Sequence, residues 1–222
     1  MIIDLTHTIK TNIPMYPGSE PPTLTPAGSF SLLGYRETRF AMGSHTGTHM
    51  DAPCHILQDG SGLEELPVSQ FCGRAVVVDV SALPQRTITA AFLREQNGIL
   101  RSADFVLFYT GWERRWNTEA FYEDTFPILD EESARYLVSC GLKGVGTDAL
   151  SLDPLEGHDF STHHILLGGG VVLLENLCLK KLLGRKDVML FALPLKYDHS
   201  DGAPVRAIAE FRDFPEKEME LQ

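Results

Sequence analysis

The apolar residues of this chain fall mostly into short runs, which predict a protein richer in strands than in helices. The first nine residues, MIIDLTHTI, alternate apolar and polar side chains, which is typical of a strand. Continuous apolar runs indicate core strands at residues 74–80, 104–110, 171–177 and 187–193, the first of them buried on both faces. Further strands are expected at residues 143–148 and 203–211.

Helices are expected between some of these strands. Residues 88–97 favour a helix with Thr87 or Thr89 as its N-cap and Gly98 as its end. A short basic helix, CLKKLLG, is expected over residues 178–184. The mixture of strands and helices indicates the α/β class.

A second clear helical segment covers residues 130–140, with Asp130 as its cap and Gly141 as its stop. Residues 11–28 contain five prolines and two glycines and predict a long extended loop, of the kind that is usually functional or mobile. No internal repeat interrupts the chain, and we expect residues 1–222 to form a single compact, strand-rich α/β domain.

Composition and charge narrow the classes of partner. The apolar share of 43% and the charged share of 22% are those of an ordinary globular protein, and the net charge is −11. An acidic balance argues against binding to nucleic acid or to an anionic membrane surface. We expect a cytoplasmic protein with reduced thiols, since the start shows no secretory pattern and the scattered cysteines form no CxxC pair. These are Cys54, Cys72, Cys140 and Cys178.

The segment HTGTHMDAPCH holds the strongest chemical signal. His45, His49, Asp51 and His55 lie at offsets 0, 4, 6 and 10. Glycine, two threonines and a proline make this a poor helix, and in an extended chain even offsets share one face. The pattern therefore predicts a metal site, which we favour over four unrelated loop side chains.

Distance requires the segment to bend. Four residues of straight strand span roughly 13 Å, whereas the ligands of one ion lie about 2.0–2.2 Å from it. Gly47 permits the bend that would bring His45 back towards His49, and Pro53 ends the strand and turns the chain. His55 could then fold back to the site without binding the ion directly.

A second segment, STHHILLGGGVVLLENL, offers further ligands. Glu175 lies inside an apolar run, where a buried carboxylate needs a cation or hydrogen-bond partners. The spacing does not choose between His163 and His164. Two histidines and a carboxylate leave an open position typical of a catalytic metal, and bridging carboxylates allow one or two ions. Asp148 and Asp153 are expected only to anchor the preceding loop.

The motif resembles the HxGTHxDxPxH signature of the cyclase-like family of metal-dependent hydrolases, whose members include bacterial kynurenine formamidases and isatin hydrolases. The opening IIDLTHTI…YPG, the segment VGTDALSLDP and the closing ALPLKYDHSDGAPVRAIA support the resemblance. It implies a swivelling β/β/α fold, a small-molecule substrate and a homo-oligomer, a dimer or tetramer. It also implies Zn²⁺, one or two ions per site, or Mn²⁺.

The resemblance also assigns roles. It places His45, His49 and Asp51 on a first ion, and Asp51, His163 and Glu175 on a second, and it makes His55 the general acid/base. Only this resemblance favours His163 over His164.

The implied reaction is cleavage of the C–N bond of an aryl formamide such as N-formylkynurenine. The alternatives are hydrolysis of a cyclic amide or lactone, and a non-catalytic ligand-binding protein of the same fold. Tyr16 is the expected substrate contact, in a YPGS stretch where the formamidases have a tryptophan. Three other aromatic residues could line the pocket, although core packing is the better interpretation for the first and last of them: Phe30, Trp112 and Phe126.

Overall fold

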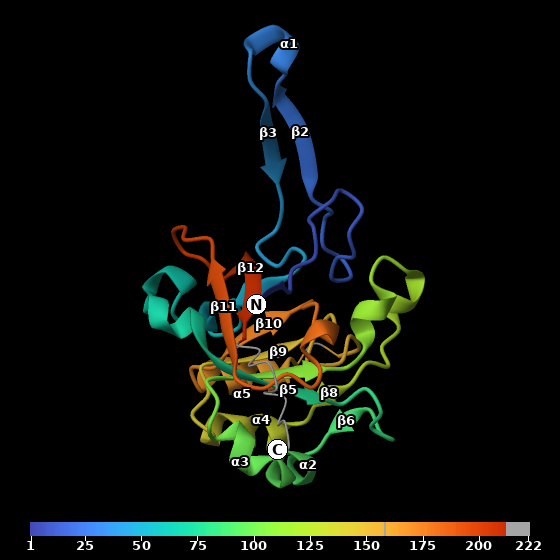
Figure 1. The fold of residues 1–222 in the computed structure, drawn as a ribbon, viewed down its shortest axis with the longest axis vertical. Helices are drawn as coiled ribbons and strands as arrows, with labels where there is room; N and C mark the ends of the chain where they lie inside the picture. Colours follow the sequence, from blue (N-terminus) through green and yellow to red (C-terminus); the bar gives the residue numbers. More distant parts are fainter. Residues whose placement is uncertain (158, 212–222) are drawn as a thin grey trace, which may run out of the picture.

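A closed barrel forms the centre of the molecule in the computed structural model, which describes residues 1–157 and 159–211. Seven strands close on themselves because β4 (His49–Asp51) pairs with β10 (Val172–Glu175) on one side and with β12 (Gly202–Glu210) on the other. The three-residue strand β4 therefore closes the barrel. The expected strand-rich α/β class is confirmed (Figure 1).

The barrel is mixed in direction. Its order is β12, β11 (Val188–Pro194), β5 (Cys72–Asp79), β7 (Phe105–Tyr109), β9 (Gly144–Thr147), β10 and β4. β5, β7, β9 and β10 run parallel to one another. The pairings that involve β11, β12 or β4 are antiparallel. The short strand β1 (Ile2–Asp4) adds to β12 outside the closed ring. Parallel strands with covered faces explain the continuous apolar runs of the sequence.

Alternate side chains of the strands fill the barrel. Phe105, Leu107 and Leu174 lie in this inner core, together with Met50 of β4. Gly146 makes room for them, because a Cβ there would lie 2.7 Å from a Leu107 methyl carbon. The short strand β9 can therefore carry a glycine inside a packed barrel.

Three helices cover the outside of the parallel strands: α2 (Ala90–Glu95), α4 (Glu131–Ser139) and α5 (Ser161–Gly168). Outward-facing Phe108 and Leu173 belong to the same core cluster as Leu93, Leu137 and Leu166 of these helices. The helices gather beside one side of the barrel (Figure 1). Two apolar layers therefore stabilise the fold, one inside the barrel and one between barrel and helices.

Helix ends were predicted with mixed success. Asp130 caps α4, its carboxylate accepting the N–H of Ser133, and Gly141 follows with a φ of 76°. Thr89 caps α2, but the predicted stop at Gly98 is wrong, since α2 ends at Glu95 and Gly98 lies inside a further short helix, α3 (Asn97–Leu100). The expected basic helix over residues 178–184 is reduced to one 3₁₀ turn, Lys180–Leu182.

The N-terminal part differs more from expectation. The strand predicted over residues 1–9 covers only β1, with a single further bridge from Thr6 to Leu177. The loop predicted over residues 11–28 contains a strand, β2 (Thr23–Gly28), which pairs with β3 (Glu37–Ala41) across the short helix α1 (Phe30–Leu33). We call residues 23–41 the arm, because this hairpin stands away from the barrel (Figure 1).

The remaining elements are short. Strands β6 (Thr87–Ile88) and β8 (Ile128–Leu129) pair with each other. Further 3₁₀ turns span Pro53–His55, Leu63–Glu65, Val68–Phe71, Trp112–Arg115 and Glu119–Tyr122. Within the described ranges, no helix is both long and apolar enough to cross a membrane. The four cysteines are unpaired, and each of them is half-buried.

Candidate metal centre and active site

Strand β4 presents two polar side chains to the outside of the barrel. His49 and Asp51 flank the inward-facing Met50, as the two-residue period of a strand requires. In the antiparallel pairing with β10, Glu175 lies directly opposite His49. The described geometry thus brings ligand-capable residues of both predicted segments onto one patch of the outer barrel wall.

Gly47 makes the predicted bend. Its φ of 65° is in the left-handed region, and it turns the chain between His45 and β4. As a result, Nδ1 of His45 lies 2.7 Å from Oδ1 of Asp51. The carbonyl of Gly47 also accepts a hydrogen bond from Nδ1 of His49 at 2.8 Å, which leaves Nε2 of His49 facing Asp51 and Glu175 at 3.3 and 3.5 Å.

Helix α5 supplies the third imidazole. Nε2 of His163 lies 3.6 Å from Asp51 and 3.5 Å from Glu175, whereas His164 is exposed to solvent. Asp153 fixes this arrangement, since its carboxylate accepts hydrogen bonds from the backbone N–H groups of Thr162 and His163 and lies 2.6 Å from Nδ1 of His163. The same side chain therefore caps the helix and orients its imidazole.

These side chains fit a divalent metal. They form two groups of close donor atoms, His45, His49 and Asp51, and Asp51, His163 and Glu175. Two ligands that are each about 2.0–2.2 Å from one ion lie roughly 3–3.5 Å apart. The distances from Asp51 to His49 and His163, and from His163 to Glu175, are close to this spacing at 3.3, 3.6 and 3.5 Å. Oε1 of Glu175 is buried and has no hydrogen-bond partner. A cation would satisfy that oxygen, because a buried carboxylate without a partner is costly.

The charges of the site lead to the same conclusion. Burial alone would lower the pKa of His45, but Asp51 and Asp201 raise it to about 10. Burial opposes the charged form of His163 as well, and the carboxylates of Asp153, Asp51 and Glu175 around its ring raise its pKa well above 6.5. Burial would raise the pKa of Asp51, yet the neighbouring imidazoles hold it well below its usual value. The buried carboxylates therefore require positive charge at this place, from protonated imidazoles or from a metal ion.

His55 lies at the mouth of the same pocket. The 3₁₀ turn Pro53–His55 places its ring 4.0 Å from that of His45 and 6.2 Å from that of His163, between ring centroids. The residue is exposed, but the surrounding protein removes enough water from its ring to lower its pKa to about 4. Its imidazole is therefore neutral at pH 7 and able to accept a proton.

The pocket has a volume of about 180 Å³. Its lining comprises all six predicted metal and acid/base residues together with Pro14, Tyr16, Ser19, Leu150, Ser151, Phe160 and Asn176. Tyr16 lies where it was predicted. Phe30 is 66% exposed in the arm, so the expectation of core packing is wrong for it, whereas Trp112 and Phe126 pack in a small core cluster.

Sequence reasoning missed several residues. Asp153 was expected only to anchor a loop, and it also holds His163. Phe160 lines the pocket next to His163, with 5.9 Å between the ring centroids. Asp201, which lies 3.2 Å from Nε2 of His45, immediately precedes β12. The available signal was the closing DHSDG stretch, where aspartates and a histidine precede the last strand.

Several known proteins are similar to this chain in sequence or in fold. The family described as "Putative cyclase" matches residues 3–154. The kynurenine formamidase of Salinibacter ruber is 34% identical over 218 residues, covering 97% of this chain and 99% of the relative. Isatin hydrolase A from Labrenzia aggregata has a TM-score of 0.82 and 26% identity, covering 94% and 93%. A structure described as a potential metal-dependent hydrolase with cyclase activity has a TM-score of 0.74 and 30% identity, covering 94% and 96%.

Proposed function

Because the chain belongs to the Cyclase family and is a hydrolase on the fold of that family, we propose that it hydrolyses the C–N bond of an aryl formamide such as N-formylkynurenine. One observation carries the proposal: two groups of metal-capable side chains share Asp51, and the neutral His55 stands beside them in one pocket. Metal ligands next to a free imidazole are the parts that hydrolysis of an unactivated amide requires.

We infer that His45, His49 and Asp51 hold one ion and that Asp51, His163 and Glu175 hold a second when two are bound. Nitrogen and carboxylate ligands suit Zn²⁺, and the two carboxylates of the second group also suit Mn²⁺. Such an ion supplies a water activated at neutral pH and polarises the substrate carbonyl. Buried ligands with fixed partners, such as His163 with Asp153, hold the site in one arrangement.

His55 then moves the proton. As a neutral imidazole it takes a proton from the attacking water, and as an imidazolium it delivers that proton to the leaving nitrogen. The ring of His55 stands directly beside the candidate ligands, with its centroid 4.0 Å from that of His45 and 6.2 Å from that of His163. For a formamide the products are an amine and formate.

The substrate side of the pocket supports an aromatic amide. Tyr16, Leu150 and Phe160 line the pocket together with the charged ligands and add apolar surface to it. A cyclic amide or lactone is the second candidate, favoured by the similarity to isatin hydrolase A and by Tyr16 in place of the tryptophan of the formamidases. The two substrates differ in whether the released carboxylate stays attached to the amine.

The deciding experiment compares N-formylkynurenine and isatin as substrates of the zinc-loaded, manganese-loaded and chelated protein. We expect chelator-sensitive turnover of N-formylkynurenine, followed by absorbance, and a faster reaction of that substrate in the Tyr16→Trp variant. Preference for isatin would reassign the substrate. Metal-loaded protein that turns over neither compound would support a non-catalytic binding protein instead.

We further propose a homo-oligomer, with a dimer as its smallest form, in the cytoplasm. The arm supports it, because its strands pair only with each other among the described strands and it exposes six large apolar side chains. These are Leu24, Phe30, Leu32, Leu33, Tyr35 and Phe40. Sedimentation should give a multiple of 24.6 kDa. The Leu32→Asp/Phe40→Asp double variant should sediment as a single chain, and an unchanged mass would place the interface elsewhere.

Four unpaired cysteines support the proposed location in the cytoplasm.

A further inference from the structure

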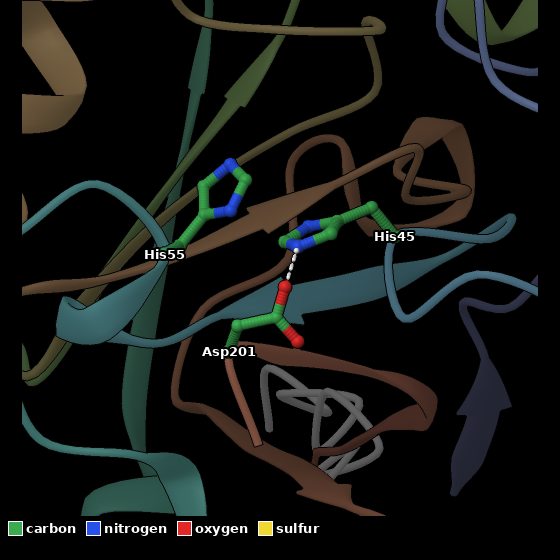
Figure 2. A group of neighbouring side chains, drawn as sticks. All are labelled: His45, His55 and Asp201. Atoms are coloured by element: carbon green, nitrogen blue, oxygen red, sulfur yellow. Dashed lines mark hydrogen bonds and ion pairs between the residues drawn. The ribbon is translucent and has the colours of Figure 1, made fainter. Parts of the chain in front are cut away.

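Asp201 contacts His45 from the side opposite the candidate metal position. Its Oδ2 lies 3.2 Å from Nε2 of His45 (Figure 2). Nδ1 of the same ring faces Asp51. We propose that Asp201 is a positioning residue, which fixes the tautomer and orientation of His45 so that Nδ1 binds the metal. This inference rests on the proposed function, because it assigns a supporting residue to that same site.

The tautomer follows from the two contacts. A neutral imidazole carries one N–H, and the nitrogen that binds a metal has none. Both ring nitrogens of His45 face a carboxylate, which can only accept a hydrogen bond, so both carry a proton while no metal is bound. A metal held between Asp51 and Nδ1 would take the place of the Nδ1 proton, and Asp201 would then keep the proton on Nε2. The ring is then held between two carboxylates of different function, with Asp51 on the metal side and Asp201 on the supporting side.

The other two imidazoles follow the same rule. Nδ1 of His49 donates to the carbonyl of Gly47, and Nδ1 of His163 faces the Asp153 carboxylate. In both residues the remaining nitrogen, Nε2, faces Asp51 and Glu175. His45 is the reversed case, and Asp201 is the partner that completes the set.

Space as well as hydrogen bonding holds the ring of His45. A Cβ on Gly202 would lie 2.6 Å from Cε1 of His45, so the ring occupies the room that this glycine leaves. The ring of His55 covers another side, with 4.0 Å between the centroids (Figure 2). Gly202 is also the pairing partner of Asp51 between β12 and β4, so Asp201 precedes the residue that pairs with this candidate ligand.

Asp201 is itself fixed before any metal binds. The hydroxyl of Ser44 donates to its carboxylate at 3.2 Å, and its backbone carbonyl accepts the N–H of Ala52 at 2.9 Å. The hydroxyl of Tyr197 lies 3.2 Å from the same carboxylate and 2.5 Å from the carbonyl of Gly202. The preceding Ser200 is anchored to Glu64 through its N–H and its hydroxyl, at 3.1 and 2.5 Å. A half-exposed carboxylate with this many fixed partners is preorganised to accept from His45.

The test compares Asp201→Ala and Asp201→Asn with Asp59→Asn, a control whose side chain is exposed and belongs to none of the groups of close metal donors. Zinc affinity is measured by chelator competition, without substrate. We expect the Kd for zinc to rise about 10- to 100-fold in Asp201→Ala and less in Asp201→Asn, whose amide oxygen can still accept. The control should stay within about 2-fold of the wild type.

A spectroscopic readout separates positioning from general stability. The ¹⁵N shifts of the His45 ring, assigned with a His45→Asn variant, should show a protonated Nε2 in the zinc-bound wild type and a mixture of tautomers in Asp201→Ala. Unchanged zinc affinity and tautomer in both Asp201 variants would overturn the proposal, as would a wild type that binds no zinc. Loss of affinity in a protein without formamide turnover would leave this inference standing and overturn the proposed substrate.

Discussion

Glu175 lies directly opposite His49 across the antiparallel pairing of β10 and β4. Side chains in such a pair are close enough to share a ligand, and this register joins the two halves of the candidate centre. Because the pairing is part of the barrel wall, the spacing of these two side chains depends on the fold rather than on a flexible loop.

The Glu175→Gln variant should bind metal more weakly. Oε1 of Glu175 is buried without a hydrogen-bond partner, and an amide cannot offer a cation the same charge. We expect the zinc-induced rise in Tm to shrink markedly, because ligand binding stabilises the folded state in proportion to the logarithm of its affinity. The exposed Glu95→Gln is the control, and an equal rise in Tm in both variants would contradict the assignment.

His55→Gln should separate catalysis from metal binding. The ring of His55 lies beside the candidate ligands at the exposed mouth of the pocket, so we expect metal content to stay at the wild-type level. Turnover should fall roughly 10²- to 10⁴-fold, the usual contribution of a general acid/base. Metal analysis and steady-state kinetics on one preparation test both statements, and loss of metal would make His55 a ligand.

Asp153→Ala should weaken the second group of ligands. The carboxylate lies 2.6 Å from Nδ1 of His163 and accepts two backbone N–H groups at the start of α5. Without it the imidazole loses its fixed orientation, and we expect a decrease in metal affinity of about 10- to 100-fold. Chelator competition measures this decrease. Asp159→Ala, in the same loop, provides a comparison that should bind metal normally.

Two glycines should respond in opposite directions to alanine. Gly47 has a φ of 65° and no atom closer than 3.6 Å to an added Cβ, so Gly47→Ala should cost about 1–2 kcal/mol of unfolding free energy through backbone strain alone. Gly98 lies in α3 with open space around it, and Gly98→Ala should stabilise by about 0.5 kcal/mol. Urea unfolding of both variants measures the two effects.

Glu64 should give the protein an acid-sensitive contribution to stability. The Ser200 hydroxyl and backbone N–H groups lower the pKa of Glu64 from 4.5 to about 2. A carboxyl group whose pKa is lower in the folded than in the unfolded protein stabilises the fold fully above pH 4.5, and this contribution disappears as the pH falls towards 2.

The measurement is the difference in unfolding free energy between metal-free wild type and metal-free Glu64→Gln, as a function of pH. That difference should be constant near pH 7, decrease below pH 4.5 and vanish near pH 2. Subtracting the variant removes the contribution of the histidines, which titrate in both proteins. A difference that persists unchanged at pH 2.5 would show that Glu64 does not stabilise through its charge.

The convergence of the side chains in the segment from His45 to Asp51 could be predicted because the information for it is local. Even spacing, a left-handed glycine and a turn-forming proline together dictate how His45, His49 and Asp51 converge. Helix α4 was predicted for the same reason, since Asp130 and Gly141 mark its ends within one short segment.

Helix α5 could not be predicted in this way. Its residues are apolar on several sides because the helix packs between β10 and α4, so no polar stripe marks it. Its first residue has no side-chain cap from a neighbour, and the cap comes instead from Asp153, eight residues before the helix begins. The choice between His163 and His164 depended on this helix and was therefore open.

Strand β2 escaped detection because prolines normally exclude a segment from a sheet. In a two-stranded hairpin each strand has one edge without a neighbouring strand. Pro26 is tolerated in β2 because, among the described strands, β2 pairs only with β3. The contact of Asp201 with His45 was equally hidden, since it joins residues 156 positions apart. Contacts of that kind depend on how the barrel closes rather than on any local pattern.

The three residues of β4 both close the barrel and carry candidate ligands, which links local opening of the barrel to metal binding. Met50 belongs to the inner core, and the backbone of β4 is the seam that joins the two ends of the barrel wall. His49 and Asp51 project from the same seam. Local opening of the β4 pairing would separate the donor atoms, so a bound cation would oppose that opening. The amide protons of β4 should therefore exchange more slowly with solvent when metal is bound.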